Sequence, residues 1–289
     1  RFGSANGKPE PGKTYDIRVV APAYGDLEST SSIPFPSAIT SVEMYESAFN
    51  HNTMIKVKFK DDPAEENFYE LYTELETETF NHNSGQIQTG RHRRSLTSED
   101  PVIQNDNDFY SNSMLFKDVL FNGKEIELTL ALSAGGITNA GEVSVTLRTM
   151  SEDGYNYLTT ADLNDQTSDD PFAQPVNVYN NIHNGFGIFA GYSASVYAKG
   201  RPKPVIASIE PPAGKAGDHI IITGENFITS PQDIVTVLFQ TQQYPIHSLV
   251  VQVTETRIEV IVPDVAVTGK IVVRNGRIAI SASDFVVTD

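Results

Sequence analysis

The chain of 289 residues contains no cysteine. This absence excludes disulfide bonds, thiolate nucleophiles and zinc sites built on cysteine. It also favours an exported protein over a cytosolic one. Long apolar runs are missing as well, since none approaches the ~18 residues of a membrane-spanning helix. Hydrophobic residues still make up 39% of the chain, which is enough to build packed cores.

Basic residues are scarce. The chain has 21 Lys and Arg against 37 Asp and Glu, for a net charge of -16. The field of such a chain repels nucleic acids and anionic membrane surfaces, so neither is expected as a partner. Most of the acidity belongs to residues 1–202, because residues 203–289 hold 6 basic and 9 acidic side chains.

Short strands dominate the pattern. Polar and apolar residues alternate in several segments, and turns rich in proline and glycine separate them. A helix is expected over residues 152–166, with Ser151 as its cap and Tyr155, Leu158 and Leu163 on one face. The pattern predicts an all-β chain of β-sandwich domains in tandem, with one short helix in the middle domain. The clearest alternating segments are residues 15–20, 54–59, 68–75, 125–132 and 142–150.

The C-terminal segment carries the most specific pattern. A Pro/Gly turn over 209–217 leads into a strand, and Gly224-Glu225-Asn226-Phe227 follows, in which Phe227 can fold back as an apolar plug. Further alternating strands end near Pro263 and at the C-terminus. This segment resembles the IPT/TIG immunoglobulin-like family over about residues 204–288. The resemblance implies an immunoglobulin-like sandwich, which we interpret as a spacer because it shows no concave aromatic cluster.

A second resemblance rests on a glycine-rich run, residues 178–193, which contains Asn180-Asn181-Ile182-His183-Asn184-Gly185-Phe186-Gly187. From the residues alone, the glycines allow a close backbone approach and the aromatic side chains are expected to fill the core. With Pro11-Gly12-Lys13-Thr14-Tyr15, Asp61-Asp62-Pro63, Asn67-Phe68-Tyr69 and Phe121-Asn122-Gly123, the run resembles a Bacteroidetes lipoprotein family, the domain of unknown function 4249, over about residues 10–198.

This second resemblance implies a place in the cell envelope. Such proteins usually begin with a lipidated cysteine and are generally found with TonB-dependent uptake systems. It therefore implies an exported protein at the outer-membrane surface, held by a lipid anchor upstream of Arg1. We predict a remnant of an N-terminal β domain at 1–37, a middle β-sandwich-like domain at 38–200 and the IPT/TIG domain at 204–289. The stretch 199–204 is expected to be a stiff, exposed linker.

Catalytic and metal motifs are missing from the sequence. There is no G-x-S-x-G elbow, and the six histidines form no H-E-x-x-H or H-x-H pair. The adjacent carboxylates Asp61/Asp62, Glu65/Glu66 and Asp169/Asp170 lie in turns and are expected to face water. We therefore predict a protein that is not an enzyme and has no cofactor and no metal. A hydrolase stays open as an alternative without a motif.

Candidate binding residues lie in a long polar excursion, residues 81–114, where a β-hairpin with a ragged tip is expected. Asp106 and Asp108 could offer oxygens to calcium, although EF-hand spacing is missing. Arg91, Arg93 and Arg94 could bind an anionic glycan, a lipid phosphate or an acidic partner, and Phe109 and Tyr110 could stack on sugars. The alternative for the basic run is a flexible surface loop.

Two functions follow as expectations. The first is a non-enzymatic envelope protein that assists a TonB-dependent transporter or binds its cargo, which could be a glycan or a peptide. The second is a stand-alone surface protein that binds glycans or adheres to them.

Overall fold

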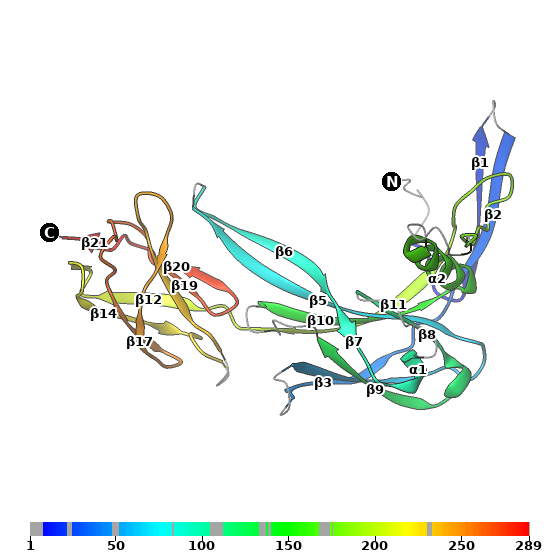
Figure 1. Ribbon diagram of the computed structural model, residues 1–289, viewed down its shortest axis with the longest axis horizontal. Helices are drawn as coiled ribbons and strands as arrows, with labels where there is room; N and C mark the ends of the chain where they lie inside the picture. The colour runs from blue at the N-terminus through cyan, green and yellow to red at the C-terminus, as the bar shows by residue number, and fades with distance from the viewer. Residues whose placement is uncertain are drawn as a thin grey trace. The chain divides into compact units, whose positions relative to one another are not determined.

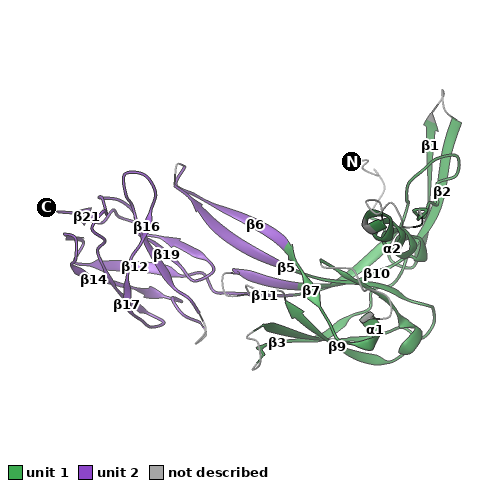
Figure 2. Cartoon of the chain, in the orientation of Figure 1, with its two compact units in different colours: residues 1–73, 93–134, 145–197 green, residues 74–92, 135–144, 198–289 purple. Residues whose placement is uncertain are grey.

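A computed structural model describes residues 8–288 except 22–24, 48–51, 83, 105–111, 133–136, 138–139, 168–173, 175 and 230–232 (Figure 1). Strands dominate this described part, which has two α-helices, so the predicted all-β class is confirmed. The chain divides into two compact units (Figure 2): unit 1 is residues 1–73, 93–134 and 145–197, and unit 2 is residues 74–92, 135–144 and 198–289. The division passes through four strands, and the predicted domain boundaries stay predictions.

The first strands of the chain form a two-stranded sheet of β1 (Lys13–Ala21) and β2 (Gly25–Ile33). A second sheet has the order β3-β4-β9-β7, and a third has the order β11-β10-β5-β6 with β8 paired to β5. Their bounds are β3 (Ile39–Glu46), β4 (Thr53–Lys60), β5 (Phe68–Asn81), β6 (Gln86–Arg94), β7 (Leu96–Thr97), β8 (Met114–Lys117), β9 (Glu125–Leu132), β10 (Glu142–Met150) and β11 (Tyr192–Gly200).

The core of unit 1 is aromatic. Alternation along β4 buries Ile55, Val57 and Phe59 while the lysines between them stay partly exposed, as a half-buried strand requires. The Phe59 and Tyr69 rings meet edge to face, with centroids 5.3 Å apart. Phe116 and Phe121 complete the cluster. The strands of this unit are therefore held together by side chains from four separate segments.

Helix α2 (Glu152–Thr167) forms where the sequence predicts a helix. The backbone N–H of Gly154 donates to the Ser151 hydroxyl oxygen at 3.4 Å, which confirms the cap. Tyr155 is buried and its ring lies 5.2 Å from that of Phe68. Leu163, near the other end of the helix, is exposed. Two short helices, α1 (Pro101–Gln104) and η1 (Asp118–Leu120), complete the described helical segments.

The C-terminal segment has two four-stranded sheets, with the orders β12-β14-β18-β17 and β16-β15-β19-β20, and a short parallel pair of β13 and β21. A cluster of buried apolar side chains from both sheets forms the core, with Ile220, Phe227 and Phe239 among them. The bounds are β12 (Val205–Glu210), β13 (Ala213–Gly214), β14 (His219–Glu225), β15 (Thr236–Phe239), β16 (Ile246–His247), β17 (Val250–Val253), β18 (Arg257–Ile261), β19 (Val272–Arg274), β20 (Ile278–Ile280) and β21 (Val286–Val287).

The predicted plug is present. Phe227 is 0% exposed, and its backbone N–H donates to Glu255 O at 3.0 Å. Asn226 adopts a φ of 59°, a left-handed conformation that asparagine tolerates. Gly224 is required because a Cβ at this position would clash with the carbonyl oxygen of Val205 and with the Phe227 ring. The sequence pattern and the packing therefore agree in this turn.

Candidate partner-binding site

The basic run lies in a strand and not in a loop. β6 (Gln86–Arg94) pairs with β5 in the hairpin expected for this region. Within unit 2, the Arg91 guanidinium lies 2.9 Å from a Glu76 carboxylate oxygen and 2.8 Å from one of Glu142. Most of its charge is therefore compensated by the protein. The flexible-loop interpretation of Arg91, Arg93 and Arg94 is wrong, because strand pairing holds their backbone.

Arg93 and Arg148 share one buried carboxylate in unit 1. Each guanidinium lies 2.8 Å from a different oxygen of Glu70. Arg93 also stacks over the Tyr72 ring at 3.7 Å, and Arg148 over the Tyr192 ring at 4.4 Å. Burial opposes the charge of Arg148, but Glu70 and the two tyrosines outweigh it and raise the pKa of Arg148. The result is a surface of alternating arginine and tyrosine side chains, in which Tyr192 is 53% exposed.

The remaining predicted residues can be placed only in part. Arg94 ends β6. Asp106, Asp108, Phe109 and Tyr110 lie outside the described residues, so the calcium and sugar-stacking hypotheses stay predictions, as does ligand binding by the three arginines. Among the residues that the structure does describe, no three acidic or histidine side chains gather as they would around a metal ion.

Sequence reasoning missed an ion-pair network in unit 2. Arg277 lies 3.1 Å from carboxylate oxygens of both Glu76 and Glu78, and the backbone N–H of Ile278 donates to Glu78 at 2.7 Å. Arg201 belongs to the predicted exposed linker, but its side chain is largely buried against Asp233. That expectation is wrong for Arg201. The sequence gives no signal for these pairs, since their members are up to about 200 residues apart.

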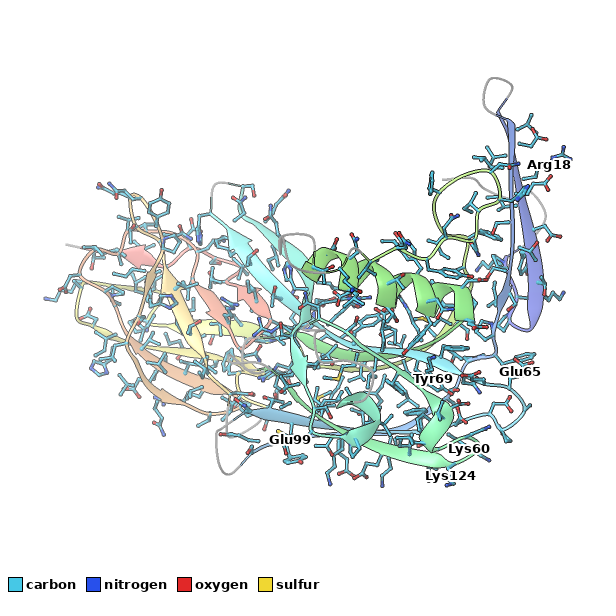
Figure 3. All side chains as sticks on the ribbon, turned by 45° about the vertical axis from the view of Figure 1, so that its right-hand side comes forward. Arg18, Lys60, Glu65, Tyr69, Glu99 and Lys124 are labelled. Atoms are coloured by element: carbon cyan, nitrogen blue, oxygen red, sulfur yellow. The ribbon has the colours of Figure 1, made fainter. Side chains whose placement is uncertain are left out.

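One predicted surface carboxylate is also buried. Asp61 is 2% exposed and accepts hydrogen bonds from the Tyr69 hydroxyl and from the Gly123 backbone N–H, the latter at 2.7 Å. Burial raises the pKa of Asp61, although both hydrogen bonds oppose the rise. Figure 3 shows Tyr69 among the side chains of unit 1. The expectation that Asp61 faces water is therefore wrong, because its carboxylate is enclosed with Tyr69 and Gly123.

The glycine-rich run forms an ordered loop held by two asparagines. The Asn180 side-chain oxygen accepts from the backbone N–H of Gly187 at 2.9 Å, and its amide donates to Gly185 O at 3.1 Å. Asn181 bonds both backbone groups of Phe189, with its oxygen at 2.9 Å from the N–H and its amide nitrogen at 2.7 Å from the carbonyl oxygen. We call residues 180–191 the signature loop. Its shape is set by its own side chains before any ligand arrives.

The signature loop lies along β2 (Figure 1). The His183 N–H donates to Glu28 O at 2.8 Å, and the Asn184 amide donates to Asp26 O at 3.3 Å. A side chain at Gly191 would clash with the backbone of Ser32, so the predicted close approach is confirmed. The same strand β2 pairs on its other side with β1, on which Arg18 projects from the hairpin (Figure 3).

The side chain of Phe186, in the signature loop, is 99% exposed. The expectation that the aromatic residues of this run fill the core is therefore wrong for Phe186. Strand β1 exposes further apolar side chains, Ile17, Val19 and Val20, and within the described chain its outer edge has no partner strand. The loop and strand β1 therefore both present apolar side chains to solvent.

The family described as Domain of unknown function (DUF4249) matches residues 2–198. The chain belongs to this family. The IPT/TIG domain follows at residues 204–287, so both resemblances are confirmed in their order along the chain. The signature loop thus lies in the last part of the DUF4249 domain. No protein of curated function matches the chain.

Solved structures show limited similarity. A structural genomics protein of unknown function from Bacteroides thetaiotaomicron is 21% identical, over 30% of this chain and 22% of its own, with a TM-score of 0.28. An auxiliary nutrient binding protein from Bacteroides ovatus is 20% identical over 30% of this chain and 21% of its own, at 0.26. SGBP-B from a complex xyloglucan utilization locus in Bacteroides uniformis is 11% identical over 87% and 50%, at 0.25. Likeness at these scores does not extend to function.

A helix that spans a membrane must be both long and apolar. Neither α-helix of the described chain is long and apolar enough to cross a bilayer.

Proposed function

We propose that this DUF4249 protein is a non-enzymatic binding protein of the cell envelope that assists a TonB-dependent uptake system at the outer-membrane surface. The observation that carries the proposal is Phe186, held fully exposed by a loop whose asparagines fix its backbone. The envelope location rests on the family resemblance. The signature loop would dock on the transporter through Phe186.

Energetics favour a protein partner at this loop. Burying one phenylalanine side chain contributes roughly 1.5–3 kcal/mol, and a preformed loop loses little conformational entropy when it binds. Hot spots in protein interfaces are exposed side chains of this kind, which fill a pocket on the partner. The charge of Arg18 on β1 would not provide such an anchor, because this side chain already forms an ion pair with Asp26.

The test is affinity isolation of the tagged protein from outer membranes of the organism that encodes it, with mass spectrometry of the captured proteins. We expect a TonB-dependent transporter with the wild-type protein and a large loss of it with Phe186→Ala. Tyr45→Ala is the matched control, because Tyr45 is an exposed aromatic residue on β3, and it should capture as well as wild type. Capture of no transporter, or equal capture by Phe186→Ala, would overturn the proposal.

A stand-alone glycan-binding role is the second candidate. It is favoured by the arginine–tyrosine surface, in which the exposed Tyr192 ring stacks on Arg148. Aromatic rings beside charged donors suit sugars. Glycan microarrays probed with wild-type protein and with Tyr192→Ala test this role, which requires that the substitution weakens binding.

A further inference from the structure

The part of the β5–β6 hairpin that belongs to unit 2, residues 74–92, is rich in acidic side chains. Alternation along β5 places Glu74, Glu76 and Glu78 on one face of the strand, at spacings of roughly 7 Å. Arg91 is the one lysine or arginine of this segment. Glu78 is nevertheless only 5% exposed, and a carboxylate is buried at a large cost unless a cation or a hydrogen-bond donor faces it. The hairpin therefore needs positive charge from another segment.

The IPT/TIG domain supplies that charge from one turn, which belongs to the same unit (Figure 2). Residues 275–277 join β19 to β20, and we call them the docking turn. Arg277 lies 3.1 Å from one carboxylate oxygen of Glu78, and the N–H of Ile278 donates to the other at 2.7 Å. The side chains of Arg277 and Glu78 are 18% and 7% exposed, so salt screens this pair only weakly. Both oxygens of Glu78 are thus bonded to the IPT/TIG domain.

Close backbone packing accompanies the ion pair. Gly276 has a φ of 104°, and a Cβ at this position would lie 2.6 Å from the carbonyl oxygen of Ala140. Only glycine permits this conformation and this approach without strain. A Cβ at Gly141 would lie 3.1 Å from Cγ of Arg277, which is also a tight fit. The docking turn is therefore packed against residues 140–141 of the DUF4249 domain as well as paired with its hairpin.

The shape of the docking turn is set by its own domain. Asn275 is 0% exposed, its side-chain oxygen accepts from the Arg277 N–H at 3.1 Å, and its amide donates to Asn226 O at 2.6 Å. The Arg277 Nε donates to Arg201 O at 3.0 Å, and the Arg201 N–H donates to Gly141 O at 2.7 Å. Arg201, which lies between the two domains in sequence, is thus bonded on both sides. Docking of this preformed turn costs little conformational entropy.

We propose that the IPT/TIG domain is an intramolecular brace, whose docking turn binds the acidic face of residues 74–92 and keeps this hairpin folded. Charge complementarity and close packing identify the chain's own hairpin as the partner of the turn. A two-stranded hairpin by itself is at best marginally stable in water, so a second surface that pairs its carboxylates stabilises it. A spacer would need no such contacts. The brace is independent of transporter capture by the signature loop, so either proposal can fail alone.

Hydrogen exchange of the complete 289-residue chain, resolved to single amides by NMR, tests the brace. Arg277→Ala should speed exchange about tenfold at the Arg201 amide and in residues 74–92, which corresponds to ~1.4 kcal/mol of lost docking free energy. Exchange in β14, inside the IPT/TIG core, should stay as in wild type. Arg257→Ala is the matched control, because Arg257 pairs with Glu259 inside the IPT/TIG domain, and it should change none of these amides.

A variant on the hairpin separates the contact from the folding of the IPT/TIG domain. Glu78→Ala should speed exchange at the Arg201 amide as much as Arg277→Ala does. The double variant should match either single variant within about twofold, because the two side chains form one contact. Wild-type exchange at Arg201 in Arg277→Ala, or fully additive effects in the double variant, would overturn the proposal. If Arg277→Ala also loosens β14, Glu78→Ala decides alone, and wild-type exchange at Arg201 in that variant would overturn the brace.

Discussion

Two phenylalanines of this protein follow shortly after an asparagine in a left-handed conformation, and their side chains reach opposite ends of the burial scale. Phe227 follows Asn226 in the IPT/TIG domain and is 0% exposed, and Phe186 follows Asn184-Gly185 in the signature loop and is 99% exposed. Both asparagines have a φ of 59°. A left-handed asparagine close before the ring is common to both segments, so this feature does not by itself decide which ring enters a core.

The neighbours of each turn make the difference. At Phe227 two sheets provide a closed apolar core, and Gly224 leaves room for the ring. At Phe186 the loop lies on the edge of the two-stranded β1–β2 sheet, and the ring lies in solvent outside the apolar cores. Burial is therefore a property of the packing around each turn and not of the turn itself.

The largest effect is expected at Phe227, the buried phenylalanine of the two. Phe227→Ala removes a fully enclosed ring and leaves a cavity, which should lower the free energy of unfolding by about 3–5 kcal/mol. Chemical denaturation followed by circular dichroism measures the loss. A loss below about 1 kcal/mol would show that the core relaxes around the gap and would weaken the contrast with Phe186.

The next largest effect is expected at Asp61, a buried polar residue in unit 1. Asp61→Ala leaves the Tyr69 hydroxyl and the Gly123 N–H without their acceptor, and should cost about 1–3 kcal/mol of unfolding free energy. Asp61→Asn can keep both bonds if its oxygen accepts from Gly123 and its amide donates to the tyrosine oxygen. It is the matched control, and equal losses in the two variants would contradict this account.

The pH dependence of the unfolding free energy gives a second test of Asp61. Because the folded pKa of Asp61 is raised above 3.8, this carboxyl favours the folded state below that pH, and the contribution is lost as pH rises through the folded pKa. Asp61→Asn does not ionise there. Its stability relative to wild type should therefore increase from pH 3.5 to neutrality, in urea titrations at fixed ionic strength. A constant difference would show that the folded pKa is not raised.

A smaller effect is expected inside the signature loop. Asn181→Ala removes two hydrogen bonds to the backbone of Phe189 and should cost about 1 kcal/mol. The loss should be local, so hydrogen exchange should speed up at residues 181–190 and stay unchanged in the IPT/TIG domain. Protection that is unaltered at the Phe189 amide would show that the loop does not depend on this asparagine.

The smallest effect on stability is expected at Phe186 itself. Phe186→Ala removes a side chain that makes almost no contact, so the unfolding free energy should change by less than about 0.5 kcal/mol. Chemical denaturation measures the stability of this variant, and the capture experiment measures its binding to the transporter. Loss of transporter capture at unchanged stability would sharpen the contrast with Phe227, whereas clear destabilisation would mean that the ring packs in solution.

Much of the fold was determined by the sequence itself. Alternation predicts β4, β9 and β10 almost to the residue, Ser151 caps α2, and Phe227 in the Gly224–Phe227 turn is buried as predicted. These features depend on neighbours close in the chain, where side-chain spacing and turn chemistry act directly. Both family resemblances rest on the same local strings.

Tertiary structure alone decided the rest. Asp61 follows a strand like many exposed acids, yet the fold buries it under Tyr69, and Arg277 finds Glu78 across 199 positions of sequence. Phe186 stays in water, although the pattern of the same run predicts a place in the core. Burial and ion pairing depend on which segments the packed layers bring together, and a linear pattern does not contain that information.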